Sequence, residues 1–298
     1  MQLLHSATRN YSWGSRTLIP HLQGQPDADK PVAELWFGAH PGDPSTVDGR
    51  LLNEVIAEDP AGQLGSRVSA EYGERLPFLL KVLAAEEPLS LQAHPSKAQA
   101  EEGFARENAA GIELTASNRN YKDDNHKPEL IVALTDFYAM AGFRPLARTR
   151  ELFAALECPE LDHYVAMLDD DPSATTESAN LRVLFTTWIT IPSAKRKELI
   201  SAIVAAGERL IAADPADWKS RVMSTVLDLN QRYPGDIGVL GALLLNHIEL
   251  SPGEAVYLDA GQLHAYVSGL GVEIMANSDN VLRGGLTPKF VDVPELVK

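Results

Sequence analysis

Short apolar runs separated by turn-forming residues characterise the first half of the chain. The runs at 77–85, 88–95 and 128–135 have the length of β-strands and are bounded by proline or polar residues. One helix is expected to follow Ser96, because Gln99 gives capping-box spacing and an Ala- and Glu-rich stretch comes next. The pattern therefore predicts a β-rich fold interrupted by a helix.

The spacing of apolar positions changes in the second half of the chain. Apolar residues fall at i, i+3, i+4 and i+7 from Leu181, and helical spacing recurs from Trp218. Strand signals return near residue 248. We therefore predict two domains, a discontinuous β domain formed by 1–145 plus 247–298 and a helical insertion domain at 146–246.

The charge balance narrows the classes of function. Among 298 residues, 26 are Lys or Arg and 41 are Asp or Glu, which gives a formal net charge of −15. A field of this sign repels nucleic-acid phosphates and anionic lipid head groups, so neither a nucleic acid nor a membrane is expected as a partner. The longest apolar run, at 239–245, is far shorter than the roughly 20 residues that span a bilayer.

A single cysteine, Cys158, bears on the cellular compartment. One thiol cannot form a disulfide within the chain, and this usage fits a reducing compartment, so a cytoplasmic location is expected. Because Cys158 lies in the helical block, we expect a small core residue there and not a nucleophile.

Potential ligands occupy one face of the predicted strand at 88–95. Alternate side chains of a strand point to opposite faces, so apolar residues share one face and Ser90, Gln92 and His94 share the other. Taken alone, His94 also fits a turn histidine beside Pro95. The presence of Gln92 on the same face favours a ligand-binding role.

A carboxylate begins the predicted strand at 128–135, whose other residues are almost wholly apolar. Burial of an unpaired ionised carboxylate is costly, so Glu129 needs either a basic side chain or a metal ion. An exposed Glu129 at the strand end, or a pair with Lys127, explains the pattern equally well. The residues alone leave these alternatives open.

The segment at 253–268 fits the spacing G-x5-P-x-G-x2-H-x3-N, in which two strands and a tight turn present a histidine. Gly253, Gly261 and His264 match this half-motif of the cupins, whereas Asp259 replaces the usual proline and Ser268 the usual asparagine. Glycine at the turn permits a positive φ angle. The segment therefore predicts an inward-facing histidine.

Gln92, His94, Glu129 and His264 together form a candidate metal-binding set. Two imidazoles, one amide and one carboxylate suit a borderline divalent ion such as Zn²⁺, and a structural zinc site would use cysteine. His94, His264 and Glu129 also satisfy the two-histidine, one-carboxylate rule for non-haem Fe²⁺. Gln92 counts against an oxygenase, because a fourth protein ligand takes a position that dioxygen needs.

Charged residues near the C-terminus extend the candidate site. Glu273 lies on a predicted strand, and Asp279, Arg283 and Lys289 follow in polar, Gly-rich sequence. Arginine and lysine there are candidate anion ligands, although single charges in such a loop are often merely solvated. Lys81 lies inside an apolar run and must find a partner.

Five segments of the chain resemble the type I mannose-6-phosphate isomerases, the zinc-dependent phosphomannose isomerases of the cupin superfamily. The segments are NYSWGS (10–15), AELWFGAHP (33–41), PFLLKVLAAEEPLSLQAHPSK (77–97), YKDDNHKPEL (121–130) and GQLHAYVSGLGVEIMANSDNVLRGGLTPK (261–289). The resemblance implies a mainly β fold, a cupin-type jelly-roll β-barrel with an inserted α-helical domain. It also implies that the second, C-terminal jelly roll of the family is absent or truncated in this chain.

The resemblance assigns a set of side chains to the active site. The implied ligands of one Zn²⁺ per chain are Gln92, His94, Glu129 and His264. The implied catalytic residues are Arg283, Glu273, Lys127 and Asp279. The implied substrate-binding residues are Ser90, Lys81, Tyr266 and Lys289.

The activity implied by the resemblance is the interconversion of mannose 6-phosphate and fructose 6-phosphate, within carbohydrate metabolism and GDP-mannose biosynthesis. A base would move a proton between C2 and C1 through a cis-enediol, with Zn²⁺ and Arg283 stabilising the developing charge. Glu273, Asp279 and Lys127 all have suitable chemistry for the base. We choose Glu273, since its surroundings can tune a carboxylate on a strand beside a cation.

The expected partner is a small sugar phosphate, and the protein is expected to be a monomer. Two alternative functions remain open on the residues alone. One is a cupin-type non-haem iron oxygenase, and the other is a non-catalytic sugar-phosphate-binding protein.

Overall fold

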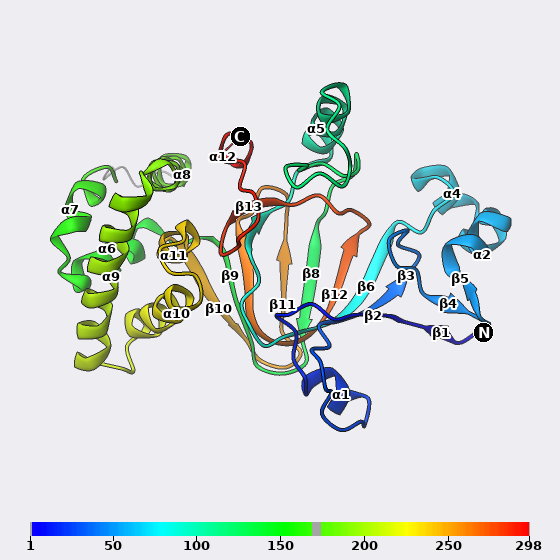
Figure 1. The fold of residues 1–298 in the computed structure, drawn as a ribbon, viewed down its shortest axis with the longest axis horizontal. Helices are drawn as coiled ribbons and strands as arrows, with labels where there is room; N and C mark the ends of the chain where they lie inside the picture. Colours follow the sequence, from blue (N-terminus) through cyan, green and yellow to red (C-terminus); the bar gives the residue numbers. More distant parts are fainter. Residues whose placement is uncertain (1, 169–173, 298) are drawn as a thin grey trace.

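The computed structural model describes residues 2–168 and 174–297, which form a large curved antiparallel sheet, a small sheet of β1, β4 and β5, and helices at both ends (Figure 1). The strands are β1 (Leu4–His5), β2 (Ala7–Arg9), β3 (Glu34–Gly38), β4 (Thr46–Val47), β5 (Arg50–Leu51), β6 (Phe78–Ala85), β7 (Leu91–Ala93), β8 (Glu129–Ala133), β9 (Phe137–Phe143), β10 (Leu245–Leu250), β11 (Ala255–Leu258), β12 (His264–Ala276) and β13 (Leu282–Gly285). The helices are α1 (Leu18–Leu22), α2 (Leu52–Glu58), α3 (Pro60–Leu64), α4 (Ser66–Tyr72), α5 (Lys97–Ala109), α6 (Leu146–Leu156), α7 (Pro159–Val165), α8 (Ala174–Thr190), α9 (Ser193–Ala213), α10 (Trp218–Arg232), α11 (Ile237–Ala242) and α12 (Val293–Leu296).

Strand β12 is the centre of the large sheet. Its first residues pair with β9 and its later residues pair with β6 on one side and β8 on the other. Gly269 lies where the strand changes partner, with φ +124°, and an added Cβ there would lie 2.7 Å from the carbonyl oxygen of Asp136. Only glycine adopts this conformation readily, so Gly269 permits the bend that curves the sheet.

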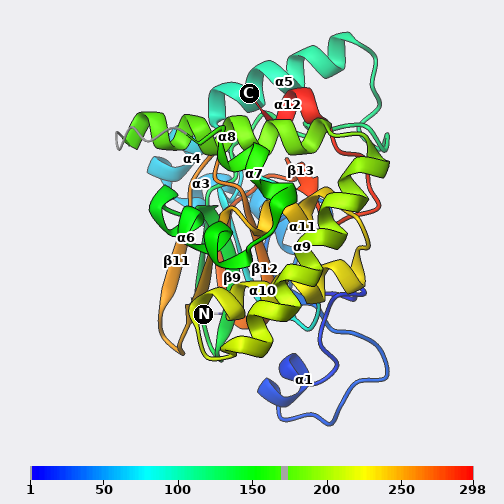
Figure 2. The ribbon, with the colours of Figure 1, turned by 90° about the vertical axis from the view of Figure 1, so that its left-hand side faces the viewer.

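Helices α6 to α11 pack on the outer face of the sheet at one end of the molecule (Figures 1 and 2). Their apolar faces form one continuous core with strand residues such as Leu91, Met140 and Ala265. Trp188 is fully buried at the centre of these helices. The helices thus cover the outer face of these strands. The opposite face lines the interior, where Ile131 and Tyr266 belong to a second core.

Several predicted elements match the structure. Strand β6 occupies the predicted run at 77–85, and Ser96 caps α5 in a capping box, with Gln99 N–H donating to Ser96 Oγ at 3.3 Å and Ser96 N–H to Gln99 Oε1 at 3.0 Å. The run at 88–95 forms a shorter strand, β7, because the prolines that flank it cannot donate to a sheet. Strand β10 begins at Leu245, slightly before the predicted return of strand signals.

The proportion of helix is larger than the prediction of a mainly β chain implied. Large antiparallel sheets are present, but helical residues outnumber strand residues in the described parts of the chain. Cys158 is buried as expected, and burial raises the pKa of its thiol. No described helix has the length and apolar character needed to cross a bilayer.

Candidate metal centre and active site

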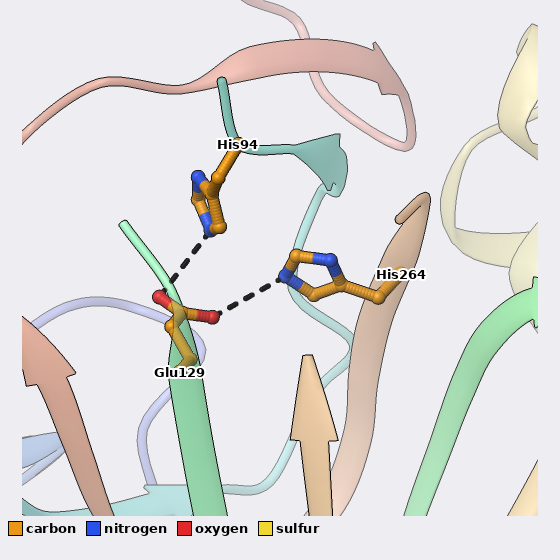
Figure 3. A group of neighbouring side chains, drawn as sticks. All are labelled: His94, Glu129 and His264. Atoms are coloured by element: carbon orange, nitrogen blue, oxygen red, sulfur yellow. Dashed lines mark ion pairs between the residues drawn. The ribbon is translucent and has the colours of Figure 1, made fainter. Parts of the chain in front are cut away.

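Three buried side chains from distant parts of the chain converge on one point (Figure 3). His94 follows β7, Glu129 begins β8 and His264 begins β12. His94 Nε2 lies 3.3 Å from Glu129 Oε1, and His264 Nε2 lies 3.4 Å from Glu129 Oε2. We call these three residues the metal cluster, since one potential ligand atom from each lies within 4.8 Å of the others.

Hydrogen bonds at the far side of each imidazole fix which nitrogen carries the proton. His94 Nδ1 lies 2.9 Å from the carbonyl oxygen of Asn280, and His264 Nδ1 lies 2.8 Å from that of Gln262. A carbonyl oxygen only accepts, so each Nδ1 donates and each Nε2, the atom left to bind a metal ion, faces Glu129. Lone pairs facing carboxylate oxygens require a cation between them.

The electrostatics of the cluster support the same conclusion. Burial lowers the pKa of His94 to about 4, so the ring is neutral at physiological pH. Burial raises the pKa of Glu129, but the Lys127 ammonium, 3.2 Å from Glu129 Oε1, is the largest cause that lowers it, and this pKa lies well below its usual range. Buried His94 Nε2, His264 Nε2 and Glu129 Oε2 have no hydrogen-bond partner among the described residues. The donor set therefore fits a divalent metal ion.

Gln92 lies directly beside the metal cluster. It is the central residue of β7, and its backbone pairs with His264 of β12 on one side and with Arg283 of β13 on the other. Its side chain lines the cavity into which Glu129 also opens. This register places an amide next to one imidazole and a guanidinium, so Gln92 is available as a fourth ligand.

A cavity of about 500 Å³ contains the remaining predicted residues. It is lined, among others, by Lys81, Ser90, Gln92, Lys127, Glu129, Tyr266, Glu273, Asp279, Arg283 and Lys289. His94 and His264 reach the same place through their contacts with Glu129. The structure thus brings together every side chain that was predicted for the site, while their individual roles remain predictions.

The same cavity is lined by a buried network of acidic and basic side chains with one tyrosine. Tyr266 donates its hydroxyl hydrogen to Glu273 Oε1 at 2.7 Å, and Lys81 Nζ lies 3.7 Å from Glu273 Oε2 and 3.5 Å from Glu34 Oε1. We call Glu34, Lys81, Tyr266 and Glu273 the lysine network. Burial lowers the pKa of Lys81, but the two carboxylates outweigh burial and raise it, so Lys81 is a cation.

Glu273 has a pKa suited to proton transfer. Burial and the charge of Glu129 raise this pKa, Lys81 and the hydrogen bond from Tyr266 lower it, and the balance lies at about 7. A carboxylate with a pKa near neutrality exchanges a proton readily at physiological pH. Of the predicted catalytic carboxylates, Glu273 therefore has the more suitable environment for a base.

Two cationic side chains, Arg283 and Lys289, also line this cavity. No described carboxylate forms an ion pair with Arg283, and burial lowers the pKa of its guanidinium. Burial, together with Arg283 and Lys122, lowers the pKa of Lys289. Cations that repel one another and have no carboxylate partner favour an anionic ligand, and the guanidinium fork suits a phosphate or an enediolate.

Sequence reasoning missed two residues that position the site. Glu34 begins β3, whose other residues are apolar. The argument that a buried carboxylate needs a cation, which was applied to Glu129, would also have identified Glu34. His40 accepts from the Gly42 N–H through Nδ1 at 3.1 Å, so its Nε2–H faces Asp279 Oδ1 at 3.3 Å. This contact is the main cause of a lowered pKa for Asp279. No sequence spacing links His40 with Asp279, which lie far apart in the chain.

The comparison with known proteins agrees with this geometry. Residues 1–146 match the family model described as "Phosphomannose isomerase type I, catalytic domain". Mannose-6-phosphate isomerase of Escherichia coli K12 is 42% identical over 305 residues, covering 100% of this chain and 74% of that protein. Mannose-6-phosphate isomerase of Homo sapiens is 37% identical over 98% of this chain and 71% of its own length.

Solved structures are similar over the whole chain. A mannose 6-phosphate isomerase bound with zinc and yttrium superimposes with a TM-score of 0.86 at 41% identity, covering 100% of this chain and 73% of that one. The apo form of mannose 6-phosphate isomerase from Salmonella typhimurium gives a TM-score of 0.87 at 41% identity, with the same coverage. With this identity over this length, the chain belongs to the type I phosphomannose isomerase family.

Proposed function

We propose that the protein interconverts mannose 6-phosphate and fructose 6-phosphate, with one Zn²⁺ held by Gln92, His94, Glu129 and His264. The observation that carries this proposal is the metal cluster, in which the buried Nε2 atoms of two imidazoles and Glu129 Oε2 face one another without a hydrogen-bond partner among the described residues. When bound, the zinc ion supplies a Lewis acid for the carbonyl and neighbouring hydroxyl oxygens of the open-chain sugar.

Glu273 is the proposed base. It takes the proton from C2 of the aldose and returns it to C1, while one hydroxyl proton moves from O2 to O1, so the cis-enediol forms and collapses without loss of atoms or electrons. Its pKa of about 7 allows both removal and return of the proton. Tyr266 and Lys81 hold the carboxylate in place through the contacts described above.

The cations of the cavity have separate tasks in this proposal. Arg283 stabilises the negative charge that develops on the enediolate oxygen, since its guanidinium has no other anionic partner in the described structure. Lys289 and Ser90, which line the same cavity, bind the substrate phosphate. Lys127 and Asp279 contact the sugar hydroxyls, with His40 keeping Asp279 ionised.

The finer description of the fold is also a proposal. We propose that the curved sheet is a jelly-roll β-barrel of the cupin type and that residues 146–246 form an inserted helical domain. The pairing of β12 with strands on both sides and the grouping of α6–α11 on one outer face support this division. The continuous core between helices and strands indicates that the two parts fold together.

Two further expectations join this proposal. A monomer in the cytoplasm is consistent with a buried free cysteine and a formal net charge of −15. The iron oxygenase and the non-catalytic binding protein are not favoured, because the relatives that cover this chain are isomerases.

The direct experiment is an isomerisation assay under anaerobic conditions. Zinc-loaded protein is incubated with mannose 6-phosphate, and fructose 6-phosphate is measured over time, with metal-stripped protein as the control. We expect product from the zinc-loaded form only. A folded, zinc-loaded protein that forms no fructose 6-phosphate would overturn the proposal.

A further inference from the structure

A second cavity lies between the outer face of the sheet and the helical block. Its volume is about 730 Å³, and strands β9, β10 and β12 line one side while the start of α6 and helix α10 line the other. Figure 2 shows α10 in front of β9 and β12 in this region. None of the described residues that line it also lines the catalytic cavity, so the two spaces are separate.

The lining of this outer cavity is rich in arginine. Arg144, Arg148 and Arg221 line it, whereas Glu249 is the one carboxylate among the described lining residues. Glu249 accepts a hydrogen bond from the Tyr138 hydroxyl at 3.3 Å. This local excess of positive charge is opposite in sign to the formal net charge of the whole protein, which is −15.

Arg144 is a buried cation without a carboxylate partner among the described residues. Its side chain belongs to a residue that is only 5% exposed, and it donates to the carbonyl oxygens of Leu243 at 2.8 Å and Leu245 at 2.7 Å. Burial and the nearby charge of Arg148 lower its pKa to about 10. These two carbonyl groups accept two of the five guanidinium N–H groups and leave the positive charge uncompensated.

The ring of Trp218 forms cation–π contacts with Arg144 and Arg148. Its ring centroid lies 3.9 Å from the Arg148 guanidinium carbon and 5.6 Å from that of Arg144. Glu151 is shared, since it accepts from the Trp218 indole N–H at 3.3 Å and lies 3.4 Å from Arg148 and 3.3 Å from Lys219. Asp217 also pairs with Lys219, at 3.1 Å, so these two carboxylates offset Arg148 and Lys219 and leave Arg144 and Arg221 without an ion pair among the described residues.

We propose that the outer cavity is a binding site for a phosphate-bearing metabolite with a planar ring, of the size of a nucleoside monophosphate. Guanidinium groups form charge-assisted hydrogen bonds with phosphate oxygens, and the exposed Arg148 and Arg221 line this cavity together with the buried Arg144. Tyr138, which is exposed and lines the cavity, supplies aromatic surface for the ring, while Trp218 holds the Arg148 guanidinium. The volume falls within the roughly 300–1,000 Å³ of small-molecule sites.

The test uses adenosine 5′-monophosphate as the probe and calorimetric titration of the zinc-loaded protein. We expect saturable binding to the wild type and at least about tenfold weaker binding to Arg148→Gln and to Arg221→Gln, because each removes a guanidinium. Arg209→Gln, an exposed position on α9 outside both cavities, is the matched control and should bind as the wild type does. Arg283→Gln, in the catalytic cavity, should also retain affinity.

Three results would overturn the proposal. They are no binding at millimolar probe, unchanged affinity in both outer-cavity variants, and loss of binding in Arg283→Gln alone, which would assign the probe to the catalytic cavity. Retained isomerase activity in Arg148→Gln and Arg221→Gln shows that each variant is folded. If Arg148→Gln fails to fold, Arg221→Gln alone decides, because Arg221 is exposed on α10.

Discussion

Two buried clusters of charge lie close together in this protein and differ in whether they are complete. In the metal cluster, His94 Nε2, His264 Nε2 and Glu129 Oε2 lack hydrogen-bond partners among the described residues. In the lysine network, Glu273 contacts both a hydroxyl donor and the ammonium of Lys81. Lys127 reaches only Glu129 Oε1 of the first cluster, so its three other ligand atoms still need a metal ion, whereas in the second cluster both oxygens of Glu273 have a partner from the chain.

The largest effect is expected when the metal cluster loses its charge. Glu129→Gln removes the one anionic ligand. Loss of a residue that merely supports a ligand lowers metal affinity roughly 10- to 100-fold, so we expect a larger decrease in zinc affinity here, with turnover lost in parallel. Metal content and the isomerisation rate measure this. Glu86→Gln, an exposed position, is the control. Full zinc occupancy in Glu129→Gln would contradict the ligand assignment.

Removal of the guanidinium should separate metal binding from catalysis. For Arg283→Gln we expect the zinc content of the wild type and a decrease in kcat of about 10²–10³-fold, because a preorganised donor to the developing enediolate is lost. Metal analysis and steady-state kinetics on the same preparation provide both numbers. A normal kcat would remove Arg283 from the proposed mechanism.

The lysine network should respond in stability as well as in activity. Lys81→Met leaves Glu34 and Glu273 without their cation, and breaking a buried pair from one side costs about 3–5 kcal/mol of unfolding free energy. Urea unfolding measures this cost. The double variant Glu34→Gln with Lys81→Met should recover part of the loss, and no recovery would mean that the network is not coupled as described.

The smallest expected effect is a shift in the pH profile. Glu273 acts as a base only when ionised, so kcat/KM of the wild type should fall about tenfold per unit below a pH of about 7. Tyr266→Phe removes a hydrogen bond that lowers this pKa, so the acid limb should move to higher pH. An unchanged acid limb in Tyr266→Phe and its persistence in Glu273→Gln would exclude Glu273 as the titrating base.

Local features of the sequence predicted local features of the structure. The capping box at Ser96 and the strand at 77–85 depend on residues that are neighbours in the chain, and both are present. Alternation placed Gln92 and His94 opposite Leu91, and the structure keeps Leu91 in the core shared with the helices. Periodicity alone was sufficient for these elements.

Features that depend on distant contacts were not predicted. His40 meets Asp279, and Arg144 approaches Trp218, only because strands and helices far apart in sequence pack together. Glu273 was chosen from the sequence among three candidate bases, but the burial and the neighbours that set its pKa come from distant contacts. The sequence alone thus predicted which residue types form the site, and the fold supplied the pKa values and the partners.

The most direct test of the central claim is anomalous diffraction at the zinc edge from crystals of the zinc-loaded protein. We expect one zinc ion per chain at the metal cluster, with His94 Nε2, His264 Nε2 and a Glu129 oxygen at about 2.0–2.2 Å and the Gln92 amide oxygen completing the set. A zinc peak elsewhere, or imidazoles that keep Nε2 directed at Glu129 with no ion between them, would contradict this account.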